Sequence, residues 1–300
     1  MIGDKYELTD KEIGRGTFSV VVEARVKATN EKVVVKIIKG GGTGTRNRRA
    51  VEKEVGLLKS LVHPCIPSVI DHFESPDEDV GIVNGCIVEN FIDGQTLKSI
   101  MLKNTQSRPL ECIPLPGVIH LTRSLISVLD YVHSRNIVHR DIKPANILIS
   151  AEGKMFLLDF GLGRLIDSVS QSTLQGAVVG TELYAAPEIL AGTLRGSMGE
   201  SYLPGADVWS IGAVIIQAIC GVKFFDDVLF ESSYYDDYDQ LKTGDKNGVP
   251  WNLQALLDRT FHQFIGTREL WEAVPECLKH VVQLCLTHDY RYNLVSRITR

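Results

Sequence analysis

The segment from residue 137 to residue 161 restricts the possible folds of this chain more than any other part of the sequence. Two apolar runs, 147–149 and 155–158, flank a polar stretch in which Glu152-Gly153 supplies a turn, so the pattern predicts a short β-hairpin. Polar residues stand just outside the hairpin, namely His139, Arg140, Asp141, Lys143 and Asn146 before it and Asp159 after it. The hairpin therefore carries two acids and an amide to one edge. Phosphoryl transfer needs such a layout, because one carboxylate can orient a hydroxyl while an amide and a second carboxylate hold Mg²⁺.

These polar residues form two motifs that resemble those of eukaryotic-type serine/threonine protein kinases. Residues 139–141 (His-Arg-Asp) with Asn146 are similar to the catalytic loop of that family, and residues 159–161 (Asp-Phe-Gly) are similar to its metal-binding loop. Two motifs in this order, one hairpin apart, are far more specific than a lone Asp-Phe-Gly, so a surface loop with chance acids is disfavoured. The resemblance implies that Asp141 orients the substrate hydroxyl and that Lys143 stabilises the transferring phosphoryl group. Asn146 and Asp159 would bind Mg²⁺.

Size and composition limit the class of protein. A chain of 300 residues with 44% hydrophobic content can form one large domain or two lobes, and a net charge of −5 gives no reason to expect nucleic-acid binding. The six cysteines include no CxxC pair, which fits reduced thiols in an intracellular protein better than a disulfide framework. The N-terminus carries no apolar signal segment and no run approaches 18 apolar residues, so we expect no membrane partner.

A strand–glycine–strand pattern stands near the start of the chain. Residues 6–13 lead into Gly14 and Gly16, and a second apolar run follows. Glycines allow backbone N–H groups to approach phosphates closely, although the pattern alone predicts only a hairpin. Its position before a buried-looking lysine resembles the kinase loop that covers the phosphates. Ser19 stands where the third glycine of that loop usually lies, so we expect a slightly stiffer loop that still binds nucleotide.

Lys36 is the single charge in the apolar strand 33–38. An unpaired buried charge is costly, so the lysine needs a partner unless it faces solvent on an edge strand. We expect the partner to be Glu54, because leucines at i+3, i+4 and i+7 from it share the buried face of the predicted helix 49–61. In the kinase family this ion pair orients the α- and β-phosphates.

The resemblance also implies where ATP binds. Further strands are expected at 69–73 and 85–91, with the hinge between the lobes at about 88–93. The residue that gates the pocket is either Val88 or Glu89, and Val88 is favoured because a carboxylate beside the adenine would be poorly solvated. The adenine would lie between Val21 and Val34 above and Leu148 below. The implied nucleotide-binding set is Ile13, Gly14, Gly16, Ser19, Val21, Val34, Lys36, Val88, Glu89 and Leu148.

The second half of the chain contains two predicted buried helices and two functional segments. Apolar periodicity predicts helices over 117–134 and from Asp207 to residue 219. Asp207 is expected either to cap its helix or, as in the family, to bind the catalytic-loop backbone. Residues 164–176 lack periodicity and are interpreted as a loop, in which Thr173, and after it Ser172, is our choice for a phosphate that pairs with Arg140.

Residues 180–188, which end in Ala-Pro-Glu, resemble the substrate-contacting loop of the family. Thr181 together with Lys143 indicates the serine/threonine branch rather than the tyrosine branch. The resemblance implies that Arg291 or Arg297 pairs with Glu188, and Arg297-Ile298-Thr299 is the more similar to the family's ending. The acidic stretch 226–239 is interpreted as a solvated face, with a docking surface for basic substrates as the alternative.

The resemblance extends over about residues 6–299 and implies an α+β fold, the two-lobed protein kinase fold. Residues 1–89 would form a small β-rich lobe with one main helix, and residues 90–300 a larger, mostly helical lobe. The implied activity is transfer of the γ-phosphate of ATP, with Mg²⁺, to Ser or Thr of protein substrates. A pseudokinase is disfavoured because the expected catalytic residues are present, and a small-molecule kinase is disfavoured by residues 181–188.

Overall fold

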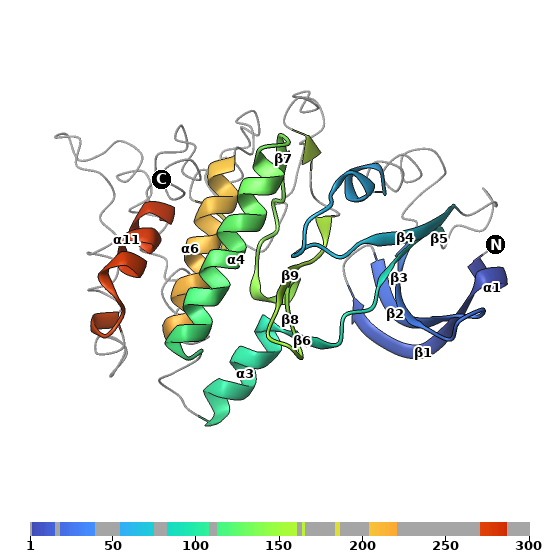
Figure 1. Cartoon of the computed structure of the whole chain (residues 1–300), viewed down its shortest axis with the longest axis horizontal. Helices are drawn as coiled ribbons and strands as arrows, with labels where there is room; N and C mark the ends of the chain where they lie inside the picture. The colour runs from blue at the N-terminus through green and yellow to red at the C-terminus, as the bar shows by residue number, and fades with distance from the viewer. Residues whose placement is uncertain are drawn as a thin grey trace. The chain divides into compact units, whose positions relative to one another are not determined.

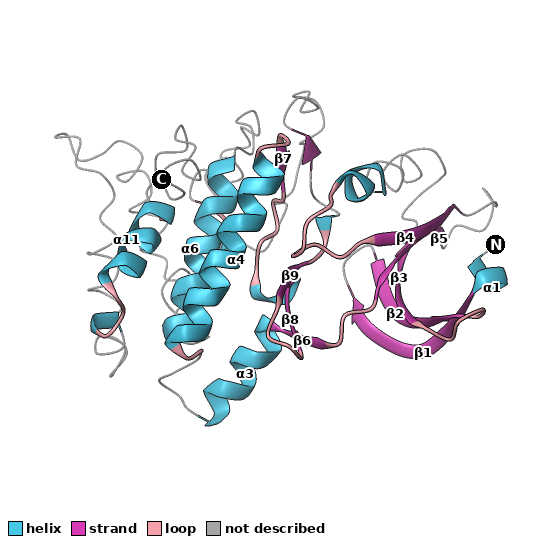
Figure 2. Ribbon diagram, in the orientation of Figure 1, coloured by secondary structure: helices cyan, strands magenta, loops and turns pink. Residues whose placement is uncertain are grey.

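The computed structural model describes residues 2–15, 19–39, 55–74, 83–107, 113–160, 164–165, 184–186, 204–220 and 271–286. The chain divides into two compact units, residues 1–94 and 95–300. Among the described residues, strands make up most of the first unit and helices most of the second, as the secondary-structure colours of Figure 2 show. The predicted α+β class, with a β-sheet N-lobe followed by a mostly helical part, is confirmed.

The first unit is built on one antiparallel sheet with the strand order β1-β2-β3-β5-β4. A four-residue helix, α1 (Ile2–Lys5), precedes it. The strands are β1 (Tyr6–Arg15), β2 (Ser19–Val26), β3 (Lys32–Lys39), β4 (Val69–Glu74) and β5 (Val83–Asn90). The strands expected near 33–38, 69–73 and 85–91 are therefore present. Residues 55–60, at the end of the predicted helix 49–61, are also helical.

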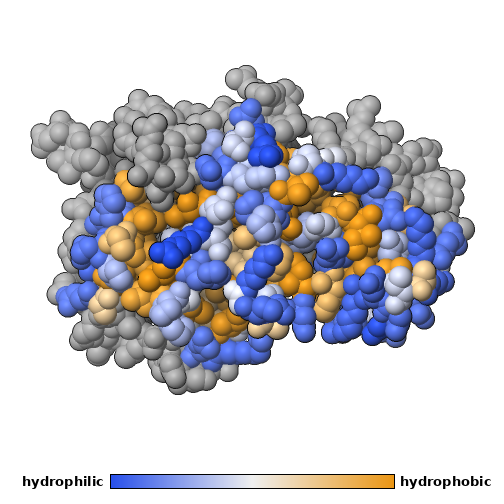
Figure 3. Space-filling model, viewed as in Figure 1, coloured by the Kyte–Doolittle hydropathy of each residue, from blue (hydrophilic) through white to orange (hydrophobic). Residues whose placement is uncertain are grey.

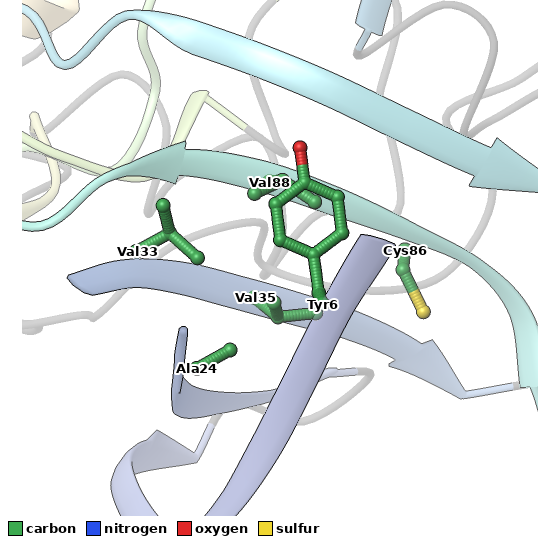
Figure 4. Packing of buried hydrophobic residues seen from close by; sticks show 6 residues of the cluster. All are labelled: Tyr6, Ala24, Val33, Val35, Cys86 and Val88. Atoms are coloured by element: carbon green, nitrogen blue, oxygen red, sulfur yellow. The ribbon is translucent and has the colours of Figure 1, made fainter. Parts of the chain in front are cut away.

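One face of this sheet carries the apolar core of the unit. Side chains alternate between the two faces of a strand, so Val33 and Val35 of β3 point to one face while Val34 and Lys36 point to the other. Figure 4 shows the core face as a cluster in which the ring of Tyr6 lies among small side chains from the central strands. The members of this cluster are Tyr6, Ala24, Val33, Val35, Cys86 and Val88.

The two edge strands of the sheet meet through the start of β1. Tyr6 stacks edge-on against Phe73 of β4 at a centroid distance of 5.8 Å, and its hydroxyl donates to Asp71 Oδ2 at 3.4 Å. Lys5 Nζ lies 2.9 Å from the same carboxylate oxygen. Because β1 and β4 are at opposite ends of the strand order, these contacts require a strongly curled sheet. Tyr6 thus covers the apolar cluster.

The described part of the second unit contains four α-helices and several short strands. Its elements are β6 (Gly94–Thr96), α3 (Leu97–Ser107), α4 (Leu115–His133), β7 (Ile137–Val138), η1 (Pro144–Asn146), β8 (Ile147–Ser150), β9 (Met155–Leu157), β10 (Arg164–Leu165), α6 (Pro204–Cys220) and α11 (Glu276–Cys285). Helices α4 and α11 both pack against α6, as Figure 1 shows. Gly212 makes the α6–α11 contact possible, since a Cβ there would lie 2.8 Å from Cys285 Cβ and 2.8 Å from the Leu286 side chain. The helices predicted at 117–134 and 207–219 are confirmed.

The predicted hairpin is present as β8 and β9. Ile147 pairs with Leu157 and Ile149 with Met155, and the turn places Gly153 at φ +81°, a conformation that favours glycine. One prediction for the following segment is wrong. Residues 164 and 165, taken as the start of a loop, form β10 and pair with Val138 and Ile137 of β7. A two-residue pairing depends on backbone hydrogen bonds and leaves no side-chain period to detect. The rest of that segment lies outside the described residues.

The described surface mixes polar and apolar residues. On the face shown in Figure 3, hydrophobic residues lie between hydrophilic ones over both units. The large apolar side chains that are exposed among the described residues are Leu8, Ile13, Val62, Ile70 and Leu102. None of the described helices combines the length and the apolar character that crossing a membrane requires.

Candidate active site

The loop between β7 and β8 is buried, and contacts from outside the loop fix its backbone. His139, Arg140 and Asp141 are all buried. Arg140 has φ +72°, which is unfavourable for a residue with a side chain and must be imposed by surrounding contacts.

Asp207, in the first turn of α6, supplies those contacts. Its Oδ2 accepts a hydrogen bond from the His139 N–H at 2.8 Å, and its Oδ1 accepts one from the Arg140 N–H at 2.8 Å. Burial alone would raise the pKa of this carboxyl, but the hydrogen bonds from His133 and from the Arg140 backbone hold the pKa below its ordinary value. The family interpretation of Asp207, that it binds the catalytic-loop backbone, is confirmed, and the helix-cap alternative is not needed to explain it.

His133 is a further partner of Asp207 that the sequence analysis did not identify. It is the last residue of α4, and its Nε2 donates to Asp207 Oδ2 at 2.9 Å. The sequence did contain a signal for this buried histidine. It is a polar side chain on the apolar stripe of α4, four residues after the buried Leu129.

His139 connects the loop to the segment that follows β9. Its Nδ1 accepts a hydrogen bond from the Asp141 N–H at 3.2 Å, so its other nitrogen carries the proton and donates to the Leu158 carbonyl at 3.0 Å. The ring packs edge-on against Phe160 with a centroid distance of 4.7 Å. One histidine therefore ties both predicted motifs together, which sequence spacing alone did not indicate.

The Asp141 carboxylate has two oxygens in different surroundings. Oδ2 lies 2.7 Å from Lys143 Nζ and accepts a hydrogen bond from Asn146 Nδ2 at 2.9 Å. The same amide nitrogen donates to the Asp141 carbonyl at 2.8 Å. Oδ1 is buried and has no hydrogen-bond partner among the residues that the structure describes. A carboxylate held in this way by one oxygen can accept a hydrogen bond from an incoming hydroxyl with the other.

Asn146 and Asp159 are brought together by the hairpin. The Leu158 N–H donates to the Asn146 carbonyl at 2.8 Å, which continues the β8–β9 pairing up to the residue before Asp159. Asp159 has φ +62° and an exposed side chain. The amide nitrogen of Asn146 faces Asp141, so its oxygen is the atom left for a cation. An amide oxygen and a carboxylate are hard ligands of the kind that Mg²⁺ prefers, and the donor set therefore fits the predicted metal.

Four of the predicted nucleotide residues lie on the sheet face opposite the apolar cluster. Val21 is the cross-strand partner of Lys36, and Val34 is the partner of Glu89, and all four side chains are half-buried. Val88 instead pairs with Val35 and is fully buried in the cluster. In this register the face that carries Val34 also carries Glu89, whereas the sequence analysis favoured Val88. Which of the two gates the pocket stays a prediction.

Residues 7–293 match the family model of the protein kinase domain. The chain belongs to the protein kinase family. It is similar to the probable serine/threonine-protein kinase fhkD of Dictyostelium discoideum, with 35% identity over 92% of this chain and 34% of the relative. It is also similar to the DNA damage response protein kinase DUN1 of Saccharomyces cerevisiae, with 26% identity over 97% of this chain and 53% of the relative. A third relative is the serine/threonine-protein kinase TIO of Arabidopsis thaliana, with 28% identity over 88% of this chain and 18% of the relative. The chain thus spans about half or less of these relatives.

Several predicted residues of this kinase domain lie outside the described residues. They are Gly16, Glu54, Ser172, Thr173, Thr181, Glu188, residues 226–239, Arg291 and Arg297. Of the remaining nucleotide residues, Gly14 and Ser19 are half-buried at the facing ends of β1 and β2, Ile13 is exposed, and Leu148 is half-buried in β8. After Glu54 the helix buries Leu58 and Leu61, as its predicted face requires, and Leu57 is half-buried. The Lys36–Glu54 pair stays a prediction.

Helix α6 of the kinase domain also holds residue 184 of the predicted substrate loop. The Tyr184 hydroxyl donates to Gln217 Oε1 at 2.7 Å, and Ser210 Oγ donates to the Tyr184 carbonyl at 2.7 Å. Gln217 and Ser210 are buried in a helix whose other described side chains are nearly all apolar. Neither residue was predicted from the sequence, although polar residues inside an apolar helix were the signal to look for.

Proposed function

We propose that this chain is a serine/threonine protein kinase domain that transfers the γ-phosphate of ATP to Ser or Thr hydroxyls of protein substrates. The observation that carries the proposal is the Asp141 carboxylate, with Oδ2 held by Lys143 and Asn146 and Oδ1 buried without a partner in the described part of the chain. Membership of the protein kinase family and the serine/threonine kinases among its relatives support the same reaction class.

In the proposed reaction Asp141 aligns the substrate hydroxyl through Oδ1 and accepts its proton. The hydroxyl oxygen forms a bond to the γ-phosphorus while the bond from that phosphorus to the β–γ bridging oxygen breaks, so ADP leaves and the phosphoester forms. Lys143, 2.7 Å from Oδ2, holds a positive charge beside the site where negative charge accumulates. The hydrogen bonds from Asn146 keep the carboxylate in one orientation, which favours a near-attack geometry.

The remaining roles concern nucleotide binding. Asn146 and Asp159 would hold Mg²⁺, which supplies charge neutralisation on the phosphates when it is bound. Lys36 with Glu54 would orient the phosphates beneath the loop of Gly14 and Gly16. The adenine would lie against Ile13, Val21, Val34, Leu148 and either Val88 or Glu89. Residues 1–89 and 90–300 would be the two lobes of the catalytic domain. The substrates would be intracellular proteins. Residues 226–239 would form a solvated face or, as the alternative, a docking surface for basic substrates.

The direct test is phosphate transfer to a generic protein acceptor. Purified protein is incubated with γ-labelled ATP, Mg²⁺ and a basic acceptor protein, and the label is assigned to Ser, Thr or Tyr by phosphoamino-acid analysis. Label on Ser or Thr that disappears in the Asp141→Asn variant is the expected result. Nucleotide binding without transfer would instead indicate a pseudokinase, and transfer only to small alcohols would indicate a small-molecule kinase.

A further inference from the structure

We infer that His133 is a positioning residue of the catalytic loop, which it orders from the end of α4 by donating its Nε2–H to Asp207. The inference rests on the proposed phosphoryl transfer by Asp141. His133 and Asp207 are fully internal, with side chains only 3% and 1% exposed. Their hydrogen bond of 2.9 Å joins helix α4 to helix α6 beneath the loop.

Asp207 has only two carboxylate oxygens for three donors. Oδ1 accepts the Arg140 N–H, while Oδ2 accepts both the His139 N–H and the His133 Nε2–H. A buried carboxylate needs such donors, because an uncompensated charge in the interior is costly. The His133 imidazole therefore holds the Asp207 carboxylate in place and stabilises its charge. The Asp207 carboxylate in turn holds the backbone of the loop.

The hydrogen bonds continue from Asp207 to the reacting carboxylate. The His139 N–H donates to Asp207, and His139 Nδ1 accepts the Asp141 N–H at 3.2 Å. Three consecutive contacts, of 2.9, 2.8 and 3.2 Å, thus lead from His133 to the backbone of Asp141. Arg140, which lies between His139 and Asp141 and donates its N–H to the other oxygen of Asp207, has φ +72° and would relax toward a commoner conformation if Asp207 were less firmly held.

The two nitrogens of His133 are not equivalent. Nε2 makes the contact to Asp207, whereas Nδ1 is buried with no partner among the described residues. Only a side chain with a donor at the Nε2 position should therefore replace the histidine. The amide nitrogen of glutamine reaches about as far as Nε2, while that of asparagine matches Nδ1. Leucine fills similar space without any donor.

Three variants, His133→Leu, His133→Gln and His133→Asn, separate the donor from the packing. Loss of the donor should lower kcat by about 10- to 100-fold with the KM for ATP changed by less than about 2-fold, because a loop displaced by a fraction of an ångström loses alignment rather than nucleotide contacts. His133→Leu and His133→Asn should show this loss, and His133→Gln should recover most of kcat. Thr122→Val is the matched control on the same helix, since the buried Thr122 Oγ1 donates only to the Val118 carbonyl within α4. It should leave kcat unchanged.

Amide hydrogen exchange at His139 and Arg140 gives a readout that does not depend on catalysis. Both amides should exchange faster in His133→Leu and His133→Asn and return toward the wild-type rate in His133→Gln, while far-UV circular dichroism verifies that each variant is folded. Wild-type kcat in His133→Leu, or His133→Gln as slow as His133→Leu, would overturn the inference. If the wild-type protein transfers no phosphate, the proposed function fails, and the exchange rates still decide whether His133 orders the loop.

Discussion

The catalytic loop and the nucleotide-facing sheet hold their functional side chains by different means. In the loop, buried polar groups such as Asp141, His139 and Asp207 are fixed by hydrogen bonds between 2.7 and 3.2 Å, and Arg140 adopts an unfavourable backbone conformation. In the sheet, Val34 and Lys36 are presented by regular antiparallel pairing, and the opposite face is an apolar cluster.

From this difference we expect that the catalytic loop positions groups for the chemical step, whereas the sheet positions groups that bind the nucleotide. A displaced hydrogen bond in the loop changes the direction of a catalytic oxygen, so it should reduce the rate more than the stability. A cavity in the apolar cluster weakens the whole sheet, so it should reduce stability first. The following predictions, ordered by size, test this division.

Among the changes outside the catalytic loop, the largest effect is expected from Lys36→Met. Removing the charge that would contact the phosphates should lower the transfer rate by about 10²–10³, as for other lost electrostatic contacts to a transition state, while the fold is retained. Glu54→Gln should cause a smaller loss. Because the two residues are expected to act as a unit, the double variant should be no slower than Lys36→Met. Single-turnover rates measure this, and additive losses would show that the two side chains do not interact.

Gly212→Ala should be the most destabilising change outside the site. Its Cβ would lie 2.8 Å from both Cys285 Cβ and the Leu286 side chain, so helices α6 and α11 must separate, at a cost of about 1–3 kcal/mol. Gly56→Ala is the matched control, since no atom lies within 4 Å of its added Cβ in the helical turn of the first unit. That change should stabilise by about 0.4–1 kcal/mol. Urea unfolding gives both values, and equal destabilisation by the two would refute the tight contact.

Val35→Ala and Val34→Ala compare the two faces of β3. Val35 is fully buried in the apolar cluster, so its truncation should reduce the free energy of unfolding by about 1–2 kcal/mol with little change in ATP affinity. Val34 is half-buried on the opposite face, so its truncation should weaken ATP binding more than stability. Urea unfolding and nucleotide titration of both variants measure this. The reverse pattern would mean that the nucleotide contacts the other face.

The smallest effect is expected from Asp71→Asn at the junction of β1 and β4. Although burial acts to raise it, the pKa of Asp71 is lowered by the hydrogen bond from Lys5, so this carboxylate stabilises the fold while it is ionised. The contribution is present above the ordinary aspartate pKa of about 3.9 and is lost as the pH falls through the lower folded value. The stability difference between wild type and variant should therefore be constant at neutral pH and shrink only in acid. A difference that changes between pH 5 and pH 7 would contradict this assignment.

Local sequence patterns were enough to predict a hairpin and a long helix. The hairpin of residues 147–157 follows from two apolar runs around a glycine turn, and helix α4 follows from the period of its apolar residues. Contacts between distant segments leave no such trace. The His133–Asp207 pair joins residues 74 positions apart, and the β7–β10 pairing is only two residues long.

The candidate site shows the same limit. Motif spacing identified Asp141 and Asn146, which the structure joins by a hydrogen bond of 2.9 Å. The choice between Val88 and Glu89 rested on solvation, whereas the orientation of both depends on the register of β3 and β5. A shift of one residue in that register would reverse which of the two side chains lies on the face of Val34.

The comparison of Asp141→Asn with Asp159→Asn tests the catalytic role of the loop most directly. Both variants keep the size of the side chain and remove its charge, and for each we would measure Mg²⁺–ATP affinity and the single-turnover rate of transfer. Asp141→Asn should slow transfer by about 10²–10⁴ with little change in Mg²⁺–ATP affinity, since it loses only a positioned base. Asp159→Asn should weaken Mg²⁺–ATP binding as well as transfer, because it removes a proposed metal ligand. An Asp141→Asn variant as fast as wild type, or a wild type that binds Mg²⁺–ATP and transfers nothing, would contradict the assignment of Asp141 as the catalytic base.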